Sequence, residues 1–365
     1  MALVLSATPA GIPPTYAAST SFTASSLLGI DSNVFLSDSN AAGQRPQSSP
    51  FVQADLVTEL ASDSARRHRL GLSLQGLYKH YLRFGEADRL FLDSALAYRY
   101  AATESLLFGV VQTLSYARLQ LLDTEGNTLP RDRFVAYSGE VRGYTQWLGT
   151  QSRLTVGAGV RRKDINEVAD QPDLLFTSLD HQGYFAYLDG LRRFSRLNIG
   201  LGYEYAVLHY GELHAAFSDG TTSLDNPLLT LIQHSGRSQV SVRVARRAVI
   251  SLDGRVRWTH DPFEDELTYR QFDLQPRGEV RLPLKLLFSG GVAYRTRAYA
   301  ERSGGGPARL DERRERFLQA DASLRKAWNK YLSVIAQAQF IRKTSNVPGD
   351  EFRERIYALG ASLAF

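Results

Sequence analysis

Hydrophobic and polar residues alternate along most of the chain from Ser19 onward, which is the period-two pattern of β-strands with one apolar and one polar face. Between Val249 and Trp258, for example, aliphatic and aromatic residues take one parity and charged residues the other. The same alternation is found in residues 70–79, 153–161, 271–282, 286–297 and 318–325. The pattern therefore predicts an all-β protein.

The length of these segments distinguishes a soluble sheet from a membrane sheet. Soluble strands average about five or six residues, whereas these alternations persist for roughly ten to fifteen, enough to cross a bilayer when tilted. No segment reaches the roughly 20 consecutive apolar residues of a membrane-spanning helix. In a transmembrane barrel the apolar parity faces lipid and the polar parity faces the lumen. We therefore predict a transmembrane antiparallel up-and-down β-barrel with a wet lumen.

The predicted connections alternate between short turns and longer polar loops, as in outer-membrane barrels. Short turns are expected near Ser62–Ala65, Ala101–Glu104, Leu148–Gln151, Arg192–Ser195, Ala245–Arg247, Pro283 and Trp328–Asn329. Long loops are expected at Asp31–Pro50, Arg83–Asp88, Asp123–Asp132, Asp164–Asp180, Gly211–Gly236, His260–Leu267, Glu301–Asp311 and Lys343–Asp350. These connections join about 16 strands, within a range of about 14 to 18, and an even number places both termini on the periplasmic side.

Two predicted strands have the weakest alternation. They are the first, around Phe22–Ile30, and the eighth, around Gln182–Gly190. In the eighth, Tyr187 and Asp189 share one parity, so an aromatic and a charged residue are expected on the same face.

Composition excludes several functional classes. The chain has no cysteine, which excludes disulfide frameworks, thiolate metal sites and cysteine nucleophiles. Its 43 basic and 38 acidic residues give a net charge of +5, but they are interspersed rather than gathered in a basic block. We therefore expect no nucleic-acid partner.

The amino end differs from the rest of the chain. Residues 1–18 are small and apolar, and the first basic residue is Arg45. Thr15 and Ala17 fit the small-residue positions before a signal cleavage point. We interpret residues 1–18 as a signal-peptide remnant or a disordered leader, and residues 19–365 as a single barrel domain.

The carboxyl end carries a second pattern. Gly360, Leu363 and the terminal Phe365 match the assembly signal of bacterial outer-membrane proteins, whereas Ala358 departs from it at a position that is usually polar. The chain thus resembles bacterial outer-membrane β-barrels. This resemblance implies insertion by the barrel assembly machinery and contact with outer-membrane lipid and lipopolysaccharide.

A short motif near the first strand is more specific. Gly29, Asp31, Asn33 and Phe35 lie in a seven-residue stretch that resembles outer-membrane β-barrel porins found beside exopolysaccharide and other secretion operons. The resemblance implies a channel or a secretion accessory, and it supplies no catalytic residue. The alternative is that Asp31, Ser32 and Asn33 form an Asx-type turn at the barrel rim.

Candidate chemistry beyond transport is sparse. The best metal-ligand spacing among the histidines is His209, Glu212 and His214, which we interpret as rim residues. No G-x-S-x-G elbow or phosphate loop is present, so we expect no enzymatic activity, no metal and no cofactor. Nine aromatics are expected in interfacial girdles rather than in sugar-stacking platforms: Tyr78, Tyr81, Tyr98, Tyr100, Tyr137, Tyr203, Tyr205, Trp258 and Tyr294.

The polar parity of three consecutive strands is rich in arginine. It carries Arg255, Arg257, Arg277, Arg281, Arg295 and Arg297 against Asp253, Asp273 and Glu279. Two interpretations remain open. Surplus arginines in open water favour anions in the lumen, whereas arginines that pair with carboxylates on adjacent strands brace the barrel.

These observations lead to three functional hypotheses. The first is an outer-membrane channel, including a conduit for exopolysaccharide or other export. The second is a plugged barrel that anchors periplasmic or other envelope proteins of a secretion or motility complex. The third is an outer-membrane hydrolase that uses side chains near the rim.

Overall fold

The computed structural model describes residues 19–34, 46–65, 67–120, 133–167, 180–215, 217, 223–263, 265, 267–299, 313–346 and 351–365. The proposed leader at residues 1–18, the loop at Asp123–Asp132, the loop at Glu301–Asp311 and Phe35 lie outside these residues. The described residues form sixteen strands and a 3-10 helix, η1 (Gly85–Ala87). The strands are β1 (Ser19–Asp31), β2 (Ser49–Ala65), β3 (His68–Tyr81), β4 (Arg89–Ala101), β5 (Leu106–Gln120), β6 (Arg133–Leu148), β7 (Ser152–Glu167), β8 (His181–Arg193), β9 (Leu197–His214), β10 (Leu228–Ala245), β11 (Ala248–His260), β12 (Tyr269–Leu282), β13 (Leu286–Tyr299), β14 (Arg314–Ala327), β15 (Leu332–Ser345) and β16 (Phe352–Ala364).

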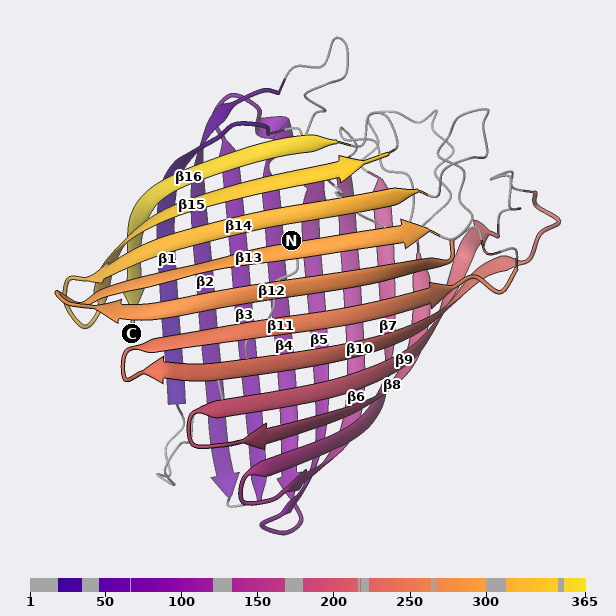
Figure 1. Ribbon diagram of the computed structural model, residues 1–365, viewed down its shortest axis with the longest axis horizontal. Helices are drawn as coiled ribbons and strands as arrows, with labels where there is room; N and C mark the ends of the chain where they lie inside the picture. The colour runs from indigo at the N-terminus through magenta and orange to yellow at the C-terminus, as the bar shows by residue number, and fades with distance from the viewer. Residues whose placement is uncertain are drawn as a thin grey trace.

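The strands form one closed antiparallel barrel in which every strand pairs with its sequence neighbours. β1 and β16 close the ring, in register from Thr23 opposite Ala364 to Asp31 opposite Ile356. Closure satisfies the backbone hydrogen bonds of both outermost strands, which a bilayer requires. Figure 1 shows the indigo and violet strands β1–β5 crossing behind the orange and yellow strands β11–β16. The predicted fold and strand number are confirmed.

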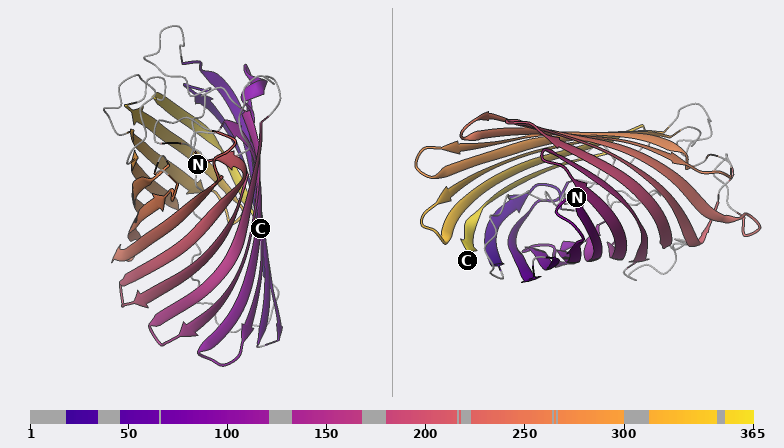
Figure 2. Two further views of the ribbon diagram at one scale, coloured as in Figure 1. Left: turned by 90° about the vertical axis from the view of Figure 1, so that its right-hand side faces the viewer. Right: turned by 90° about the horizontal axis from the view of Figure 1, so that it is seen from below.

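The two ends of the barrel differ in their connections. All seven predicted short turns are present at one end of the barrel, which we call the turn end, and the strand ends at the opposite end form the loop end (Figure 2). The loop predicted at Gly211–Gly236 is shorter than expected, because β9 continues to His214 and β10 starts at Leu228. These two residues pair with each other, so the hairpin ladder extends beyond the alternating segment.

Side-chain exposure confirms the predicted parity. Leu252, Val256 and Trp258 of β11 are exposed on the outer wall, while Thr259 of the opposite parity is buried inside. Tyr187 in β8 is also buried inside. The exposed apolar side chains form the surface that meets lipid. Among the described residues, no helix is long and apolar enough to cross a membrane.

The aromatic prediction is wrong at one position. Tyr81 is fully buried inside the barrel, because it shares the lumen-facing parity with Lys79. The other eight aromatics take the outer parity. Seven of them are exposed on the outer wall: Tyr78, Tyr98, Tyr137, Tyr203, Tyr205, Trp258 and Tyr294. Histidines join them there, since the His234 ring lies 5.2 Å from Tyr205 and 5.4 Å from Trp258.

Candidate functional site: the lumen

Burial of the lumen-facing side chains changes along the barrel axis. Near the loop end most of them are buried, including Asp31, Phe51, Lys79, Tyr81, Tyr210, Leu229, Leu231, Tyr269, Gln271, Arg297, Tyr299, Glu315, Lys343 and Glu354. Near the turn end many of them are exposed, as Arg153 and Arg281 show. The lumen therefore has a packed half and a more open half.

A buried ionic group, here called the seam cluster, joins the closing strands to β3 and β4. It comprises Asp31, Lys79, Tyr81, Arg89 and Glu354. Asp31 Oδ2 accepts from Lys79 Nζ at 2.8 Å and from the Tyr81 hydroxyl at 2.7 Å. Arg89 Nη2 lies 3.4 Å from Glu354 Oε1. Buried charges need such partners, so the cluster fixes β1 and β16 against the adjacent wall.

The motif near the first strand contributes to this cluster. The backbone N–H of Asn33 donates to Asp31 Oδ1 at 3.1 Å, which is the Asx turn expected as the alternative interpretation. The Asn33 side chain also donates to the backbone oxygen of Arg353 at 2.9 Å, across the β1–β16 seam. Gly29 lies where an added Cβ would overlap the Phe51 ring. The motif residues described here therefore support barrel closure.

A second buried group lies on β12–β14, here called the β13 cluster. Arg297 donates through Nη2 to Gln271 Oε1 at 2.9 Å, and its Nη1 lies 3.9 Å from Glu315 Oε2. Its guanidinium also covers the Tyr269 ring at 4.6 Å. Arg313 reaches the other Glu315 oxygen at 2.5 Å. These contacts occupy the guanidinium of Arg297.

An apolar cluster completes the packed half. Leu208 and Tyr210 of β9 pack with Leu229 and Leu231 of β10. The partly buried Phe263 packs against them from the connection that follows β11. This part of the interior offers no charge to a solute.

Ion pairs between strands continue into the middle of the lumen. Arg161 Nη2 lies 2.6 Å from Glu204 Oε1, and Arg237 Nη2 lies 2.5 Å from Asp189 Oδ2. Each pair skips one strand, so each bridges three neighbouring strands. Such ladders brace the wall and reduce its net charge.

The predicted arginine wall is divided between these environments. Arg297 belongs to the β13 cluster, and Arg295 Nε donates to Asp273 Oδ1 at 2.6 Å. With the Gln275 amide turned so that its oxygen faces Arg277, this oxygen accepts from Arg277 Nε at 3.1 Å. Arg255 and Arg281 are exposed, and Arg257 is partly buried. Bracing therefore accounts for Arg295 and Arg297, whereas Arg281 lies near the turn end and belongs to a different set.

That set is a ring of seven arginines, here called the mouth ring. Every short turn contributes one arginine on the lumen-facing parity within three residues of a strand end: Arg69, Arg99, Arg153, Arg193, Arg243, Arg281 and Arg325. All seven are exposed. Apart from Arg69, none forms an ion pair or a side-chain hydrogen bond with a described residue. Lumen-facing acids near this end include Glu59 and Glu279, which are also exposed.

The strand register brings members of the mouth ring close together. Arg69 lies directly opposite Arg99 across β3 and β4. Arg281 and Arg325 both lie opposite Leu287, one from each side of β13. Like charges directly opposite each other destabilise a sheet, as Arg69 and Arg99 are placed here, and Arg281 and Arg325 are separated by one strand.

Sequence reasoning identified only Arg281 of this ring. The signal was present, since each predicted short turn has an arginine beside it on the polar parity. The arginines of the ring are spread over seven hairpins, whereas the arginines of the predicted wall lie on three consecutive strands. A ring becomes recognisable only when the turns are compared with one another.

The predicted carboxyl-terminal residues lie at the seam between β1 and β16. Phe365 pairs with Phe22 through two backbone hydrogen bonds of 2.9 and 3.1 Å and stacks on Tyr331 at 5.5 Å. Leu363 is exposed on the outer wall, while Gly360 packs under Leu27 at the seam. The assembly role of these residues stays a prediction.

The histidine trio is not assembled into a site. His209 contacts Thr230 Oγ1 at 3.2 Å, and His214 contacts the backbone oxygen of Asn226 at 2.6 Å. Within the part of the chain that the structure describes, no group of three histidine, aspartate and glutamate side chains could hold a metal ion.

Comparisons with known proteins support the fold. No family model matches the chain, and no curated protein matches it at a significant level. Among solved structures, CdiB from Acinetobacter baumannii gives a TM-score of 0.52 at 9% identity, covering 94% of this chain and 60% of that one. OmpT, an outer membrane protein of Vibrio cholerae, gives 0.48 at 9% identity over 95% and 97% of the two chains. A bacterial polysaccharide outer membrane secretin gives 0.44 at 10% identity over 95% and 97%. The fold is that of outer-membrane β-barrels.

Proposed function

We propose that this protein is an outer-membrane channel whose turn end admits anionic solutes. The mouth ring is the observation that carries the proposal, because it presents seven exposed guanidinium groups around one end of the lumen. Deeper in the lumen, Arg161, Arg237, Arg295 and Arg297 form ion pairs, whereas six of the seven arginines at the mouth form none with a described residue.

The physical basis is the field of fixed charges beside a low-dielectric wall. Membrane and strands focus this field into the aqueous mouth and raise the local concentration of anions. A guanidinium also presents a planar fork of donors that matches carboxylate and phosphate groups. A ring of such forks would bind a polyanion at several points, each weakly.

Acidic polysaccharide is the solute class that we propose. Short turns face the periplasm in outer-membrane barrels, so the mouth ring would meet a polymer before it leaves the cell. The carboxylates that repeat along an acidic polysaccharide could pair with several arginines of the mouth ring at once. The resemblance of residues 29–35 to porins beside exopolysaccharide operons agrees with this class.

Proteoliposomes test the solute class. Labelled oligogalacturonate and a neutral dextran of matched size would be enclosed with the wild-type barrel or with an Arg99→Gln, Arg153→Gln, Arg193→Gln variant. We expect the acidic oligomer to leave faster than dextran through the wild type, and the two rates to converge in the variant. Equal rates through the wild type would contradict the proposal.

The plugged anchor remains a second candidate, because the packed half of the lumen favours it. The seam, β13 and apolar clusters bring together side chains of nine strands near the loop end. Single-channel recording separates the two functions. A channel gives unitary current steps in a planar bilayer, whereas a barrel that stays electrically silent at all voltages would support the anchor.

A further inference from the structure

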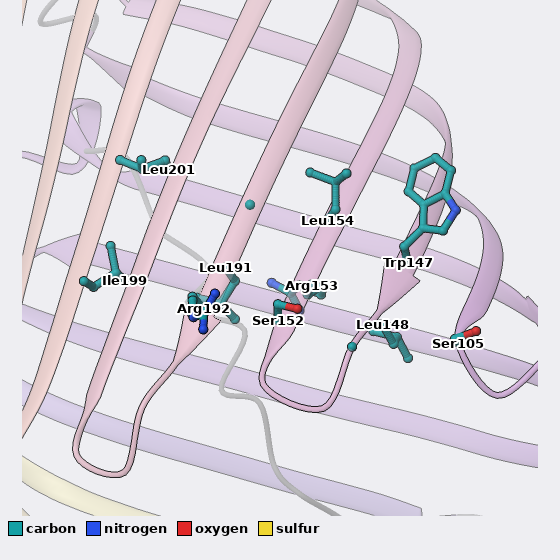
Figure 3. Close-up of a pocket in the computed structure, with 12 residues that line it drawn as sticks. Ser105, Trp147, Leu148, Ser152, Arg153, Leu154, Leu191, Arg192, Ile199 and Leu201 are labelled. Atoms are coloured by element: carbon teal, nitrogen blue, oxygen red, sulfur yellow. The ribbon is translucent and has the colours of Figure 1, made fainter.

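The outer wall carries a groove near the turn end, across β6–β9 (Figure 3). Its volume is about 480 Å³. Its lining on the outward parity consists of Trp147, Ser152, Leu154, Gly190, Arg192, Ile199 and Leu201. Leu148, Arg153 and Leu191 of the lumen-facing parity also border the groove, but most of its side chains lie on the outer wall, so it opens toward lipid.

The strand register explains the hollow. Trp147 lies opposite Leu154, Leu154 opposite Gly190, and Gly190 opposite Leu201, so these four residues form one row across four strands. Gly190 is the only member of this row without a side chain. A Cβ added there would meet nothing closer than the Leu201 backbone oxygen at 4.0 Å. The backbone does not require glycine at this position, and its effect is to leave the groove open.

A cation marks one end of the groove. Arg192 is exposed on the outer parity and forms no ion pair with a described residue. Its guanidinium lies 5.6 Å from the Phe194 ring, which holds it beside the groove. Arg192 is next to the last residue of β8, so it lies where the wall meets the headgroup layer, while Leu154 and Leu201 extend the groove toward the membrane interior.

We propose that this groove binds an anionic glycerophospholipid, with one acyl chain in the groove and the phosphate on Arg192. An occupant must be apolar along Leu154 and Leu201 and negatively charged at the turn end, and a phospholipid with an acidic headgroup has this distribution. Arg192 and Gly190 face away from the lumen, so substitutions at these two positions leave the arginines of the mouth ring in place.

Quenching of Trp147 fluorescence tests the site. A barrel with Trp258→Phe and Trp328→Phe leaves Trp147 as the sole tryptophan. It would be reconstituted in mixed phosphatidylglycerol and phosphatidylcholine vesicles in which one lipid or the other carries brominated acyl chains. We expect an apparent preference for phosphatidylglycerol of about fivefold, which corresponds to the roughly 1 kcal/mol of one arginine beside anionic lipid.

Matched variants assign this preference to the groove. Arg192→Gln should abolish it by removing the charge, and Gly190→Leu by filling the hollow. Gly278→Leu adds the same side chain on the outer parity of β12, where nothing lies within 4 Å of the added Cβ, and should leave the preference intact.

Three results would overturn the proposal. The first is equal quenching of Trp147 by the two lipids. The second is a preference that survives Gly190→Leu, which would reduce the effect to charge alone. The third is a preference that survives Arg192→Gln, which would remove the phosphate contact.

Discussion

The two ends of the lumen use arginine in opposite ways. Arg297 and Arg281 share one parity on adjacent strands, but Arg297 is 5% exposed and contacts Gln271 and Glu315, whereas Arg281 is exposed at the mouth. At the loop end, ion pairs hold strands together inside the protein. At the turn end, guanidinium groups stand in water beside the membrane. Position along the strand therefore decides whether an arginine is buried in contacts with other strands or exposed at the mouth.

The largest effect is expected when a buried pair is broken. Lys79→Met leaves the Asp31 carboxylate buried without its cation, and such a loss costs about 3 to 5 kcal/mol. Both side chains are nearly inaccessible, at 5% and 0% exposure. Urea unfolding of the barrel in liposomes, followed by gel mobility without boiling, measures this cost.

Arg281→Met is the matched control at the turn end. Its urea midpoint of unfolding should lie near that of the wild type, because removing an exposed arginine leaves no buried carboxylate without its cation. If Lys79→Met were equally mild, the seam cluster would have no structural role.

The next effect concerns the outer wall. Val292→Lys places a charge on the lipid face and should destabilise the barrel by about 2 to 4 kcal/mol if it lies near the bilayer centre. Ala293→Lys places the same side chain on the lumen-facing parity of the same strand and should cost much less. Equal losses for the two variants, in the same unfolding assay, would contradict the assignment of inside and outside.

A smaller effect on stability is expected at the carboxyl end. Phe365→Ser should lower the amount of barrel that reaches the membrane, because it alters the residue expected to direct assembly. The same variant refolded in detergent should unfold close to the wild type, since Phe365 is 66% exposed. Membrane fractionation measures the first quantity, and normal accumulation of the variant there would remove the assembly role.

Much of the fold could be predicted because membrane strands encode inside and outside locally. Each residue's parity states whether it meets lipid or lumen, so sixteen strands and seven turns were visible without long-range information. Tyr81 shows the limit of this reasoning. Tyrosine is common in girdles, and only its shared parity with Lys79 places it inside.

The candidate site was less predictable because it depends on register and depth. The pairing of Arg297 with Glu315 requires β13 and β14 to be aligned, and the row from Leu154 through Gly190 to Leu201 requires β7–β9 to be aligned. The residues of a single strand do not reveal how that strand is aligned with its neighbours. The predicted wall therefore combined arginines that brace the barrel with one that belongs to the mouth.

The most direct test of the central claim is the reversal potential of single channels under a salt gradient. The wild type should prefer anions, and the preference should weaken at higher salt as the Debye length shortens. A variant with Arg99→Gln, Arg153→Gln, Arg193→Gln and Arg281→Gln should lose most of it. The triple variant Arg255→Ala, Arg277→Ala, Arg295→Ala should lose less, since two of its arginines already contact wall residues. A cation-selective wild type, or a mouth-ring variant with unchanged reversal potential, would contradict the account.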